Sequence, residues 1–144
     1  MKRGSQLTLK INNIKFPSTG ISECEGKKIY VKGAFPGQTV KATVKKNREG
    51  YAEAKLVEVI EKAGYEIEAP CPHFGVCGGC SSQNLTYEKQ LELLSDEICD
   101  LFEEKDLPMG MYLGVKGSEN CWEYRNKMEF TFGDLEKGGE LTLG

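Results

Sequence analysis

Three cysteines and the only histidine of the chain lie within ten residues of one another, in the segment CPHFGVCGGCSSQ (residues 71–83). The cysteines Cys71, Cys77 and Cys80 have the spacing C-x5-C-x2-C. Two cysteines separated by two residues can bind one metal centre together, because the short loop turns both sulfur atoms the same way. Gly78 and Gly79 lack Cβ atoms, so backbone N–H groups can approach thiolates or inorganic sulfide closely. We therefore expect the three thiolates to converge on one centre.

The spacing leaves several kinds of centre open. A structural zinc site would use Cys71, His73, Cys77 and Cys80, although His73 follows Pro72 and has little freedom to turn toward the sulfurs. A [4Fe–4S] cluster would use the three cysteines and a fourth from elsewhere. A redox-active dithiol at Cys77 and Cys80 is a weaker alternative, because no strand and helix frame the pair. Cysteines without any ligand are the least favoured interpretation.

The rest of the sequence indicates a reducing compartment. No apolar run approaches the ~20 residues that span a bilayer, and the start MKRGSQLTLKINN lacks the apolar centre of a secretory signal. We therefore expect a cytoplasmic protein that is not bound to a membrane. Separately, we expect the protein to be a monomer. Disulfides are rare in the cytoplasm, which favours metal or redox chemistry for the clustered cysteines.

Charge is distributed unevenly along the chain. Residues 1–60 contain twelve Lys and Arg against five Glu, a net charge of +7. Because the whole chain has a net charge of −3, residues 61–144 have a net charge of −10. A basic module of this size is a candidate surface for nucleic acid, because phosphates that it neutralises release their counterions. A merely solvated lysine-rich surface is the alternative.

The basic module has the pattern of a small β-barrel. Apolar residues alternate with polar ones in QLTLKI, KKIYVKG, TVKATVKK and YAEAKLVEVI, as in half-buried strands. The connections FPGQ and NREG have turn chemistry, with Pro36 and Gly37 suited to a type II turn. Strands this short and closely spaced predict a closed, OB-like five-stranded barrel, which leaves no exposed edge.

Basic and aromatic residues of this barrel are candidates for RNA binding. Phosphates would lie against the basic side chains and bases against Tyr30 and Tyr51, although each tyrosine also suits simple packing. The basic candidates in the barrel are Lys41, Lys45, Lys46, Arg48 and Lys55.

One amphipathic helix is predicted over residues 86–107. Its apolar stripe comprises Tyr87, Leu91, Leu94, Ile98, Leu101 and Phe102. Thr86 is the expected N-cap and Pro108 follows the end. Cys99 would flank the buried stripe, whereas Cys24 would be a loop thiol.

The last segment predicts a further β unit. In WEYRNKMEFTF (residues 122–132) apolar and polar residues alternate, and DLEKGGELTLG reads as a turn into a partner strand. Arg125 and Lys127 are further candidates for RNA contact, or else partners of Glu123 and Glu129 in salt bridges. Cys121 could serve as a surrogate fourth ligand of the metal centre.

Longer motifs link these parts to known families. The stretch STGISECEGKKIYVKGAFPGQTVKATV resembles a TRAM domain, an RNA-binding barrel of RNA-modifying enzymes. CPHFGVCGGCSSQNLTYEKQLELL followed by WEYRNKMEFTFG resembles the N-terminal part of the S-adenosylmethionine-dependent RNA 5-methyluridine methyltransferases, with matches at Gln83, Tyr87 and Gln90. The resemblance extends from about residue 5 to the end of the chain.

The resemblance implies a function and a cofactor. Enzymes of this family methylate C5 of a uridine in ribosomal or transfer RNA, and a catalytic cysteine first adds to C6 of the uracil ring. It also implies a [4Fe–4S] cluster on Cys71, Cys77 and Cys80, with a fourth cysteine beyond Gly144. The S-adenosylmethionine motif, catalytic cysteine and catalytic acid of the family are absent, so we expect the chain to be an inactive N-terminal fragment.

We therefore expect an α+β chain in four parts. These are a TRAM-like barrel (1–63), an iron–sulfur loop (64–85), the helix (86–107) and the beginning of a central β domain (108–144). A stand-alone zinc or iron–sulfur module that binds RNA without catalysing a reaction is the alternative function.

Overall fold

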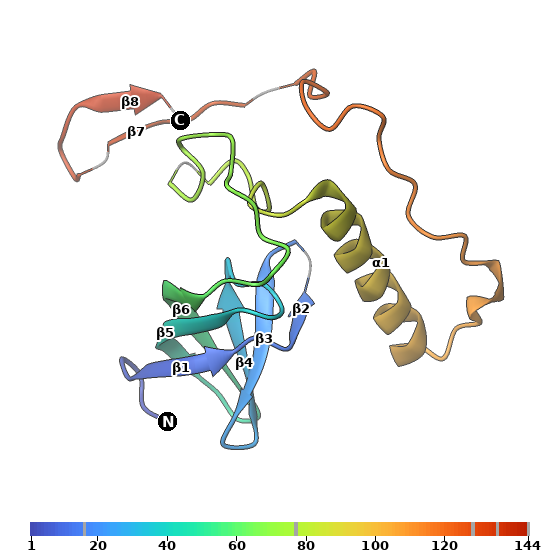
Figure 1. The fold of residues 1–144 in the computed structure, drawn as a ribbon. Coiled ribbons are helices and arrows are strands. Elements are labelled where there is room, and N and C mark those ends of the chain that lie inside the picture. Colours follow the sequence, from blue (N-terminus) through green and yellow to red (C-terminus); the bar gives the residue numbers. More distant parts are fainter. Residues whose placement is uncertain (16, 77, 128, 135, 144) are drawn as a thin grey trace.

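The computed structural model describes residues 1–15, 17–76, 78–127, 129–134 and 136–143. Eight strands and one α-helix are distributed over these residues, which confirms the predicted α+β class (Figure 1). The strands are β1 (Gln6–Lys10), β2 (Asn13–Lys15), β3 (Thr19–Cys24), β4 (Lys27–Lys32), β5 (Thr39–Asn47), β6 (Tyr51–Glu61), β7 (Phe132–Asp134) and β8 (Leu141–Leu143). The helix is α1 (Tyr87–Glu104), and a 3₁₀ turn, η1, follows at Met109–Met111.

The first six strands form one curled sheet in the order β1-β5-β6-β4-β3-β2. All pairs are antiparallel except β4 and β6, which run parallel. The two edge strands, β1 and β2, are consecutive in the chain and are separated only by Ile11 and Asn12. One stretch, residues 6–15, thus pairs with β5 at one end of the sheet and with β3 at the other. This arrangement gives the sheet the shape of a barrel, with six strands where five were predicted.

Apolar residues of alternating positions fill the inside of the curled sheet. The core consists of Leu9, Ile11, Ile29, Val31, Ala34, Val40, Ala42, Val44, Ala52 and Ala54. Apart from Ala34, which follows β4, these residues lie in the segments whose period-2 patterns predicted strands. Their polar neighbours in sequence consequently point outward.

Two predicted turns have the expected backbone. Gly37 has φ +84°, and the Gln38 amide donates to the Phe35 carbonyl at 3.2 Å, as the type II turn requires. Gly50 has φ +81° in the connection of β5 to β6, where the Arg48 amide donates to the Tyr51 carbonyl at 2.9 Å. A side chain at either glycine would strain the turn.

Helix α1 is attached to the barrel through a second, smaller apolar cluster. Leu93 of α1 packs with Leu85, Ile14 and Phe35. Thr86 is the N-cap as predicted, because its Oγ1 accepts from the Lys89 amide at 3.3 Å. The predicted stripe is wrong in detail: Leu93, which it omitted, is the buried residue of the helix, and Leu101 is 49 % exposed. The helix rests on the edge strand β2 and not on a broad sheet, so only a narrow face is covered.

The segment after α1 leaves the barrel and is exposed over most of its length (Figure 1). The predicted strand over residues 122–132 is wrong, because only Phe132–Asp134 pairs with Leu141–Leu143. Met128, which the predicted pattern included, lies outside the described residues. Alternation alone cannot hold a strand that has no partner and no core to cover it. No described helix is long and apolar enough to cross a membrane.

Candidate nucleic-acid interface and cysteine loop

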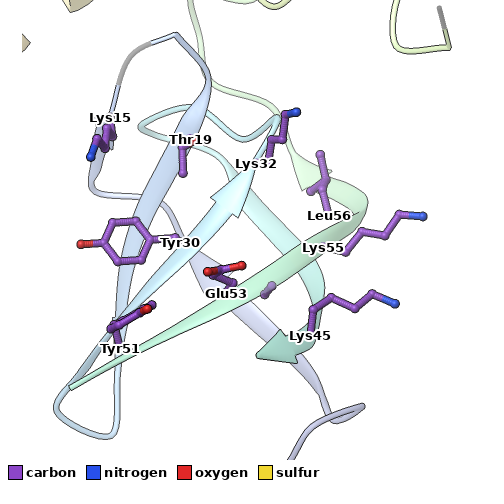
Figure 2. Close-up of a pocket in the computed structure, with 10 residues that line it drawn as sticks. Lys15, Thr19, Tyr30, Lys32, Lys45, Tyr51, Glu53, Lys55 and Leu56 are labelled. Carbon is purple, nitrogen blue, oxygen red and sulfur yellow. The ribbon is translucent and has the colours of Figure 1, made fainter. Parts of the chain in front are cut away.

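A groove of about 680 Å³ lies on the outer face of the barrel (Figure 2). Alternation along β4 and β6 explains it: Ile29 and Val31 point into the core, so Tyr30 and Lys32 point outward. The groove is lined by Lys15, Thr19, Tyr30, Lys32, Lys45, Tyr51, Glu53, Ala54, Lys55 and Leu56. Its chemistry is mainly basic and aromatic.

The parallel pairing of β4 with β6 sets the neighbours within the groove. Tyr30 lies beside Glu53, and Lys32 lies beside Lys55. Like charges on neighbouring strands repel each other. The pair of lysines therefore favours the approach of an anion.

Tyr30 and Tyr51 form an edge-to-face pair at one side of the groove. Their ring centroids are 5.9 Å apart and their planes are inclined by 76°. The pairing restrains both rings. Tyr51 remains 39 % exposed, which leaves aromatic surface available to a ligand.

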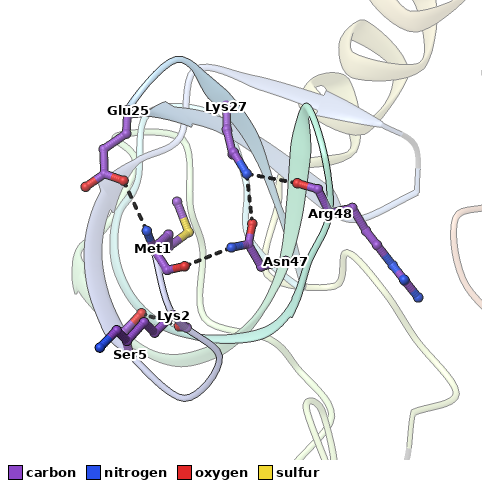
Figure 3. A network of polar contacts seen from close by, with 7 residues as sticks. All are labelled: Met1, Lys2, Ser5, Glu25, Lys27, Asn47 and Arg48. Atoms are coloured by element: carbon purple, nitrogen blue, oxygen red, sulfur yellow. Dashed lines mark hydrogen bonds and ion pairs between the residues drawn. The ribbon is translucent and has the colours of Figure 1, made fainter.

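A second basic hollow of about 270 Å³ adjoins the groove. It is lined by Arg3, Lys45, Lys46, Asn47 and Arg48, and Lys45 lines both depressions. Lys27 Nζ donates to Asn47 Oδ1 at 3.1 Å and to the Arg48 carbonyl at 2.9 Å, which holds the β5–β6 turn (Figure 3). The side chain of Arg48 extends away from these contacts (Figure 3).

The predicted basic residues fall in different places. Lys45, Lys46, Arg48 and Lys55 line the two depressions, whereas Lys41 lies outside the lining of both. Arg125 and Lys127 lie in the exposed C-terminal segment, where Lys127 Nζ contacts Glu129 Oε1 at 2.8 Å. Sequence reasoning missed Arg3, Lys15, Lys32 and Glu53. The sequence could have identified Lys32 and Glu53, because each alternates with buried residues of its strand and therefore points outward.

The cysteine loop follows the barrel. Cys71 is half-buried, Cys80 and His73 are exposed, and Cys77 lies outside the described residues. Gly75 and Gly78 have φ +82° and +71°. Gln83 Nε2 donates to Cys80 Sγ at 3.0 Å. The five described cysteines form no disulfide.

The described residues of this loop do not form a metal site by themselves. Among the described residues no three His, Cys, Asp or Glu side chains are grouped to hold a metal ion, and Cys77 is not among those residues. The exposed sulfur of Cys80, the half-buried Cys71 and the open space around Gly78 are compatible with thiolate ligation. These features are compatible with a zinc ion and with an iron centre alike.

The carboxylate of Glu66 ties the end of the cysteine loop to the barrel. Its Oε1 accepts from the Ala63 amide at 2.7 Å and from Gln38 Nε2 at 2.9 Å, and its Oε2 accepts from Asn84 Nδ2 at 3.3 Å. Gln38 is buried, and its Oε1 in turn accepts from the Phe35 amide at 2.8 Å. Glu66 thus connects residues on both sides of the loop.

Tyr65 lies next to this carboxylate. Its hydroxyl donates to the Pro36 carbonyl, and Lys89 Nζ lies 4.8 Å from the ring centroid. Burial, together with the charges of Glu66 and Glu92, raises the pKa of Tyr65 to about 12. The phenol therefore stays protonated and able to donate well above neutral pH.

The N-terminal part of the chain is similar to a known domain. Residues 1–57 match the family model of the TRAM domain. The matched region runs from the N-terminus through β1–β5 into β6, so the groove and the adjoining hollow both lie within it. The TRAM-like barrel inferred from the sequence is confirmed.

Curated relatives extend the similarity beyond the TRAM domain. An uncharacterized RNA methyltransferase of Clostridium tetani is 51 % identical over all 144 residues, and one of Clostridium acetobutylicum is 48 % identical over the same length. A 23S rRNA (uracil(1939)-C(5))-methyltransferase RlmD of Alkalilimnicola ehrlichii is 34 % identical over 138 residues. The chain spans about a third of the length of each relative (31–32 %). These similarities confirm the resemblance to RNA methyltransferases that the motifs indicated.

Proposed function

We propose that this chain is the RNA-holding, N-terminal region of an enzyme that transfers a methyl group from S-adenosylmethionine to C5 of a uridine in ribosomal or transfer RNA. The observation that carries the proposal is the basic groove on the TRAM domain, in a chain that is similar along its length to RNA methyltransferases. S-adenosylmethionine would supply the methyl group in the full enzyme. No residue of this chain is assigned to its binding or to catalysis.

The TRAM domain would supply affinity for RNA. Lys15, Lys32, Lys45 and Lys55 line the groove and would neutralise phosphates, and each neutralised phosphate releases a counterion. A uridine in folded RNA must leave its stack before C5 becomes accessible. A barrel that holds the neighbouring nucleotides would help to keep the target in its extruded position.

The cysteine loop would brace this region. We propose that Cys71, Cys77 and Cys80 bind a [4Fe–4S] cluster, with zinc as the alternative, and that the role is structural because methyl transfer requires no electron. The support is the C-x5-C-x2-C spacing, the Gln83 contact to the Cys80 sulfur and the anchoring of the loop by Glu66. The proposed parts are the barrel (1–63), the loop (64–85), the helix (86–107) and the beginning of a β domain (108–144). Monomeric state and cytoplasmic location stay predictions.

RNA binding by the chain tests the first part of the proposal. Fluorescence anisotropy with single-stranded RNA should give an affinity that falls with increasing salt, as counterion release requires. Lys55→Glu in the groove should weaken binding about tenfold, because it replaces an attraction by a repulsion. Lys62→Glu, at an exposed position outside both depressions, is the matched control, and equal losses in the two variants would contradict a role of the groove in RNA binding.

Metal analysis tests the second part. Anaerobic purification should yield iron and sulfide with a visible absorption band, and replacing Cys71, Cys77 and Cys80 by serine should abolish both. Zinc in place of iron would select the alternative metal, and a metal-free thiol protein would exclude both. Methyl transfer is tested on the longer reading frame, with labelled S-adenosylmethionine and RNA. A longer protein that binds RNA but transfers no methyl group would favour the stand-alone binding module.

A further inference from the structure

We propose that the groove of the TRAM domain holds one unpaired guanine, which it recognises through Glu53. The inference rests on the proposed function, because it takes RNA as the ligand. It adds the kind of nucleotide that occupies the groove and the residue that selects it. The target uridine is a different nucleotide and is bound elsewhere in the enzyme.

The position of Glu53 within the groove is the first observation. Its carboxylate lies between Tyr30 and Tyr51 on one side and Lys45 and Lys55 on the other, and the two lysine side chains extend away from it (Figure 2). A carboxylate repels phosphate, so the RNA backbone is held at the lysines of the rim and not above Glu53. The centre of the groove suits an uncharged group that donates hydrogen bonds.

The ion pair of Glu53 leaves the carboxylate accessible. Lys46 Nζ contacts Glu53 Oε2 at 2.9 Å, with the two side chains 59 % and 43 % exposed. Ion pairs this exposed contribute little and rearrange easily. In an RNA complex Lys46 can turn toward a phosphate in the adjoining hollow, which it also lines.

The aromatic pair is the second observation. Tyr51 and Glu53 are two residues apart on β6 and share its outer face, a spacing of about 7 Å along the strand. A base stacked on the exposed ring of Tyr51 therefore extends its edge toward the carboxylate. Stacking on tyrosine requires an unpaired base and is tolerant of base identity.

Base chemistry then selects guanine. Its N1–H and N2 amino group are adjacent donors that match the two oxygens of a carboxylate. Adenine and cytosine present an acceptor beside their amino group, and uracil presents carbonyls on both sides of N3–H. Each of these places an oxygen or nitrogen lone pair against the negative charge of Glu53.

Basic side chains beside the groove can contact the phosphates on either side of the bound base. Lys32 and Lys55 are neighbours on β4 and β6, and the hollow lined by Arg3 and Arg48 continues from the groove through Lys45. A strand that passes over both depressions places one base near Tyr51 and its phosphates against basic side chains. The surface is therefore suited to a short single-stranded segment.

The test compares short fluorescein-labelled uridine oligomers that carry one central guanosine, adenosine, cytidine or inosine with the all-uridine oligomer. Anisotropy titrations of the chain at one salt concentration should show about tenfold tighter binding for the guanosine oligomer. Inosine keeps N1–H but lacks the amino group, so its oligomer should lose most of that preference. Equal affinities for all the oligomers would overturn the inference while leaving RNA binding, and hence the proposed function, intact.

Glu53→Gln separates recognition from bulk charge. Removing one negative charge should strengthen binding to the oligomers without guanosine, whereas loss of the guanine contact should abolish the preference for guanosine. Glu58→Gln is the matched control, because it removes the same charge from the same strand outside the groove lining. That variant should bind all oligomers at least as tightly and keep the preference. A guanosine preference that survives in Glu53→Gln would overturn the role of Glu53, and failure of the chain to bind any oligomer would overturn the proposed function itself.

Discussion

At the scale of single residues, the side chain of Glu66 joins the barrel to the end of the cysteine loop. It accepts hydrogen bonds from Ala63, Gln38 and Asn84, and the Gln38 side chain lies inside the barrel end. Hydrogen bonds to a charged group contribute more than neutral ones. A single carboxylate therefore carries much of the polar contact between the loop and the barrel.

Glu66→Gln should lower the free energy of unfolding by about 1–3 kcal/mol. The amide offers one acceptor oxygen, so a donor among Ala63, Gln38 and Asn84 loses its partner. Urea unfolding followed by circular dichroism measures the loss. Glu68→Gln, at an exposed position two residues along, is the control and should change stability by less than about 0.5 kcal/mol. Equal stability of the two variants would contradict the role of Glu66.

Tyr65 gives the fold a dependence on alkaline pH. Its pKa is about 12 in the folded chain against an ordinary value of 10, so the folded state holds this proton more tightly. The contribution to stability is complete below pH 10 and is lost as the pH rises from 10 to 12. The midpoint of unfolding should therefore fall as the pH rises from 10 to 12. The fall should be less steep in Tyr65→Phe, which lacks this phenol, than in Tyr124→Phe. Parallel pH profiles for the two variants would refute the assignment.

At the scale of elements, one helix residue secures α1 to the barrel. Leu93 packs on Ile14, Phe35 and Leu85, whereas Leu101 on the same helix is 49 % exposed. Leu93→Ala should lower the free energy of unfolding by about 2–3 kcal/mol. This loss is near the lower end of the range for buried leucines, because the cluster is small. Leu101→Ala should cost less than about 1 kcal/mol. Thermal unfolding measures both, and a larger loss in Leu101→Ala would contradict the packing.

Local sequence predicted the elements whose partners are close in the chain. The alternation around Ile29 and Val31 and the positive φ of Gly37 follow from neighbouring residues, and both are confirmed. The Thr86 cap is equally local. Phe132 shows the limit: its alternating segment predicted a strand from residue 122, but pairing begins only at 132 because a ladder needs a partner.

The groove depended on information that is not local. Tyr30 and Glu53 are neighbours only because β4 and β6 pair in parallel, with β5 between them in sequence. Nothing near either residue specifies that pairing, so the sequence predicted separate lysines and tyrosines and not a groove. The parallel crossover also explains why Glu53 was missed among the basic candidates.

At the scale of the whole molecule, stability should be concentrated in the barrel. Leu113, Met111, Phe132 and Leu141 are 72–98 % exposed, and most of residues 105–143 is exposed. Exposed backbone without packed neighbours exchanges its amide hydrogens rapidly. Hydrogen exchange by mass spectrometry should show protection over β3–β6 and rapid exchange over residues 113–127. Comparable protection in the two regions would contradict this distribution.

The two borders of the curled sheet belong to one run of ten residues. Residues 6–10 shield β5 and residues 13–15 shield β3, and Gly20 lets this run cross closely, since a Cβ there would come within 2.8 Å of the Ala34 carbonyl oxygen and of Ile11 Cγ2. Detachment of that single run would uncover two unpaired strand borders at once, on opposite ends of the sheet. Residues 6–15 of a second copy of the chain could then pair with the uncovered strands, and the same exchange in the other direction would form a swapped dimer. Swapped dimers would therefore originate in the first fifteen residues.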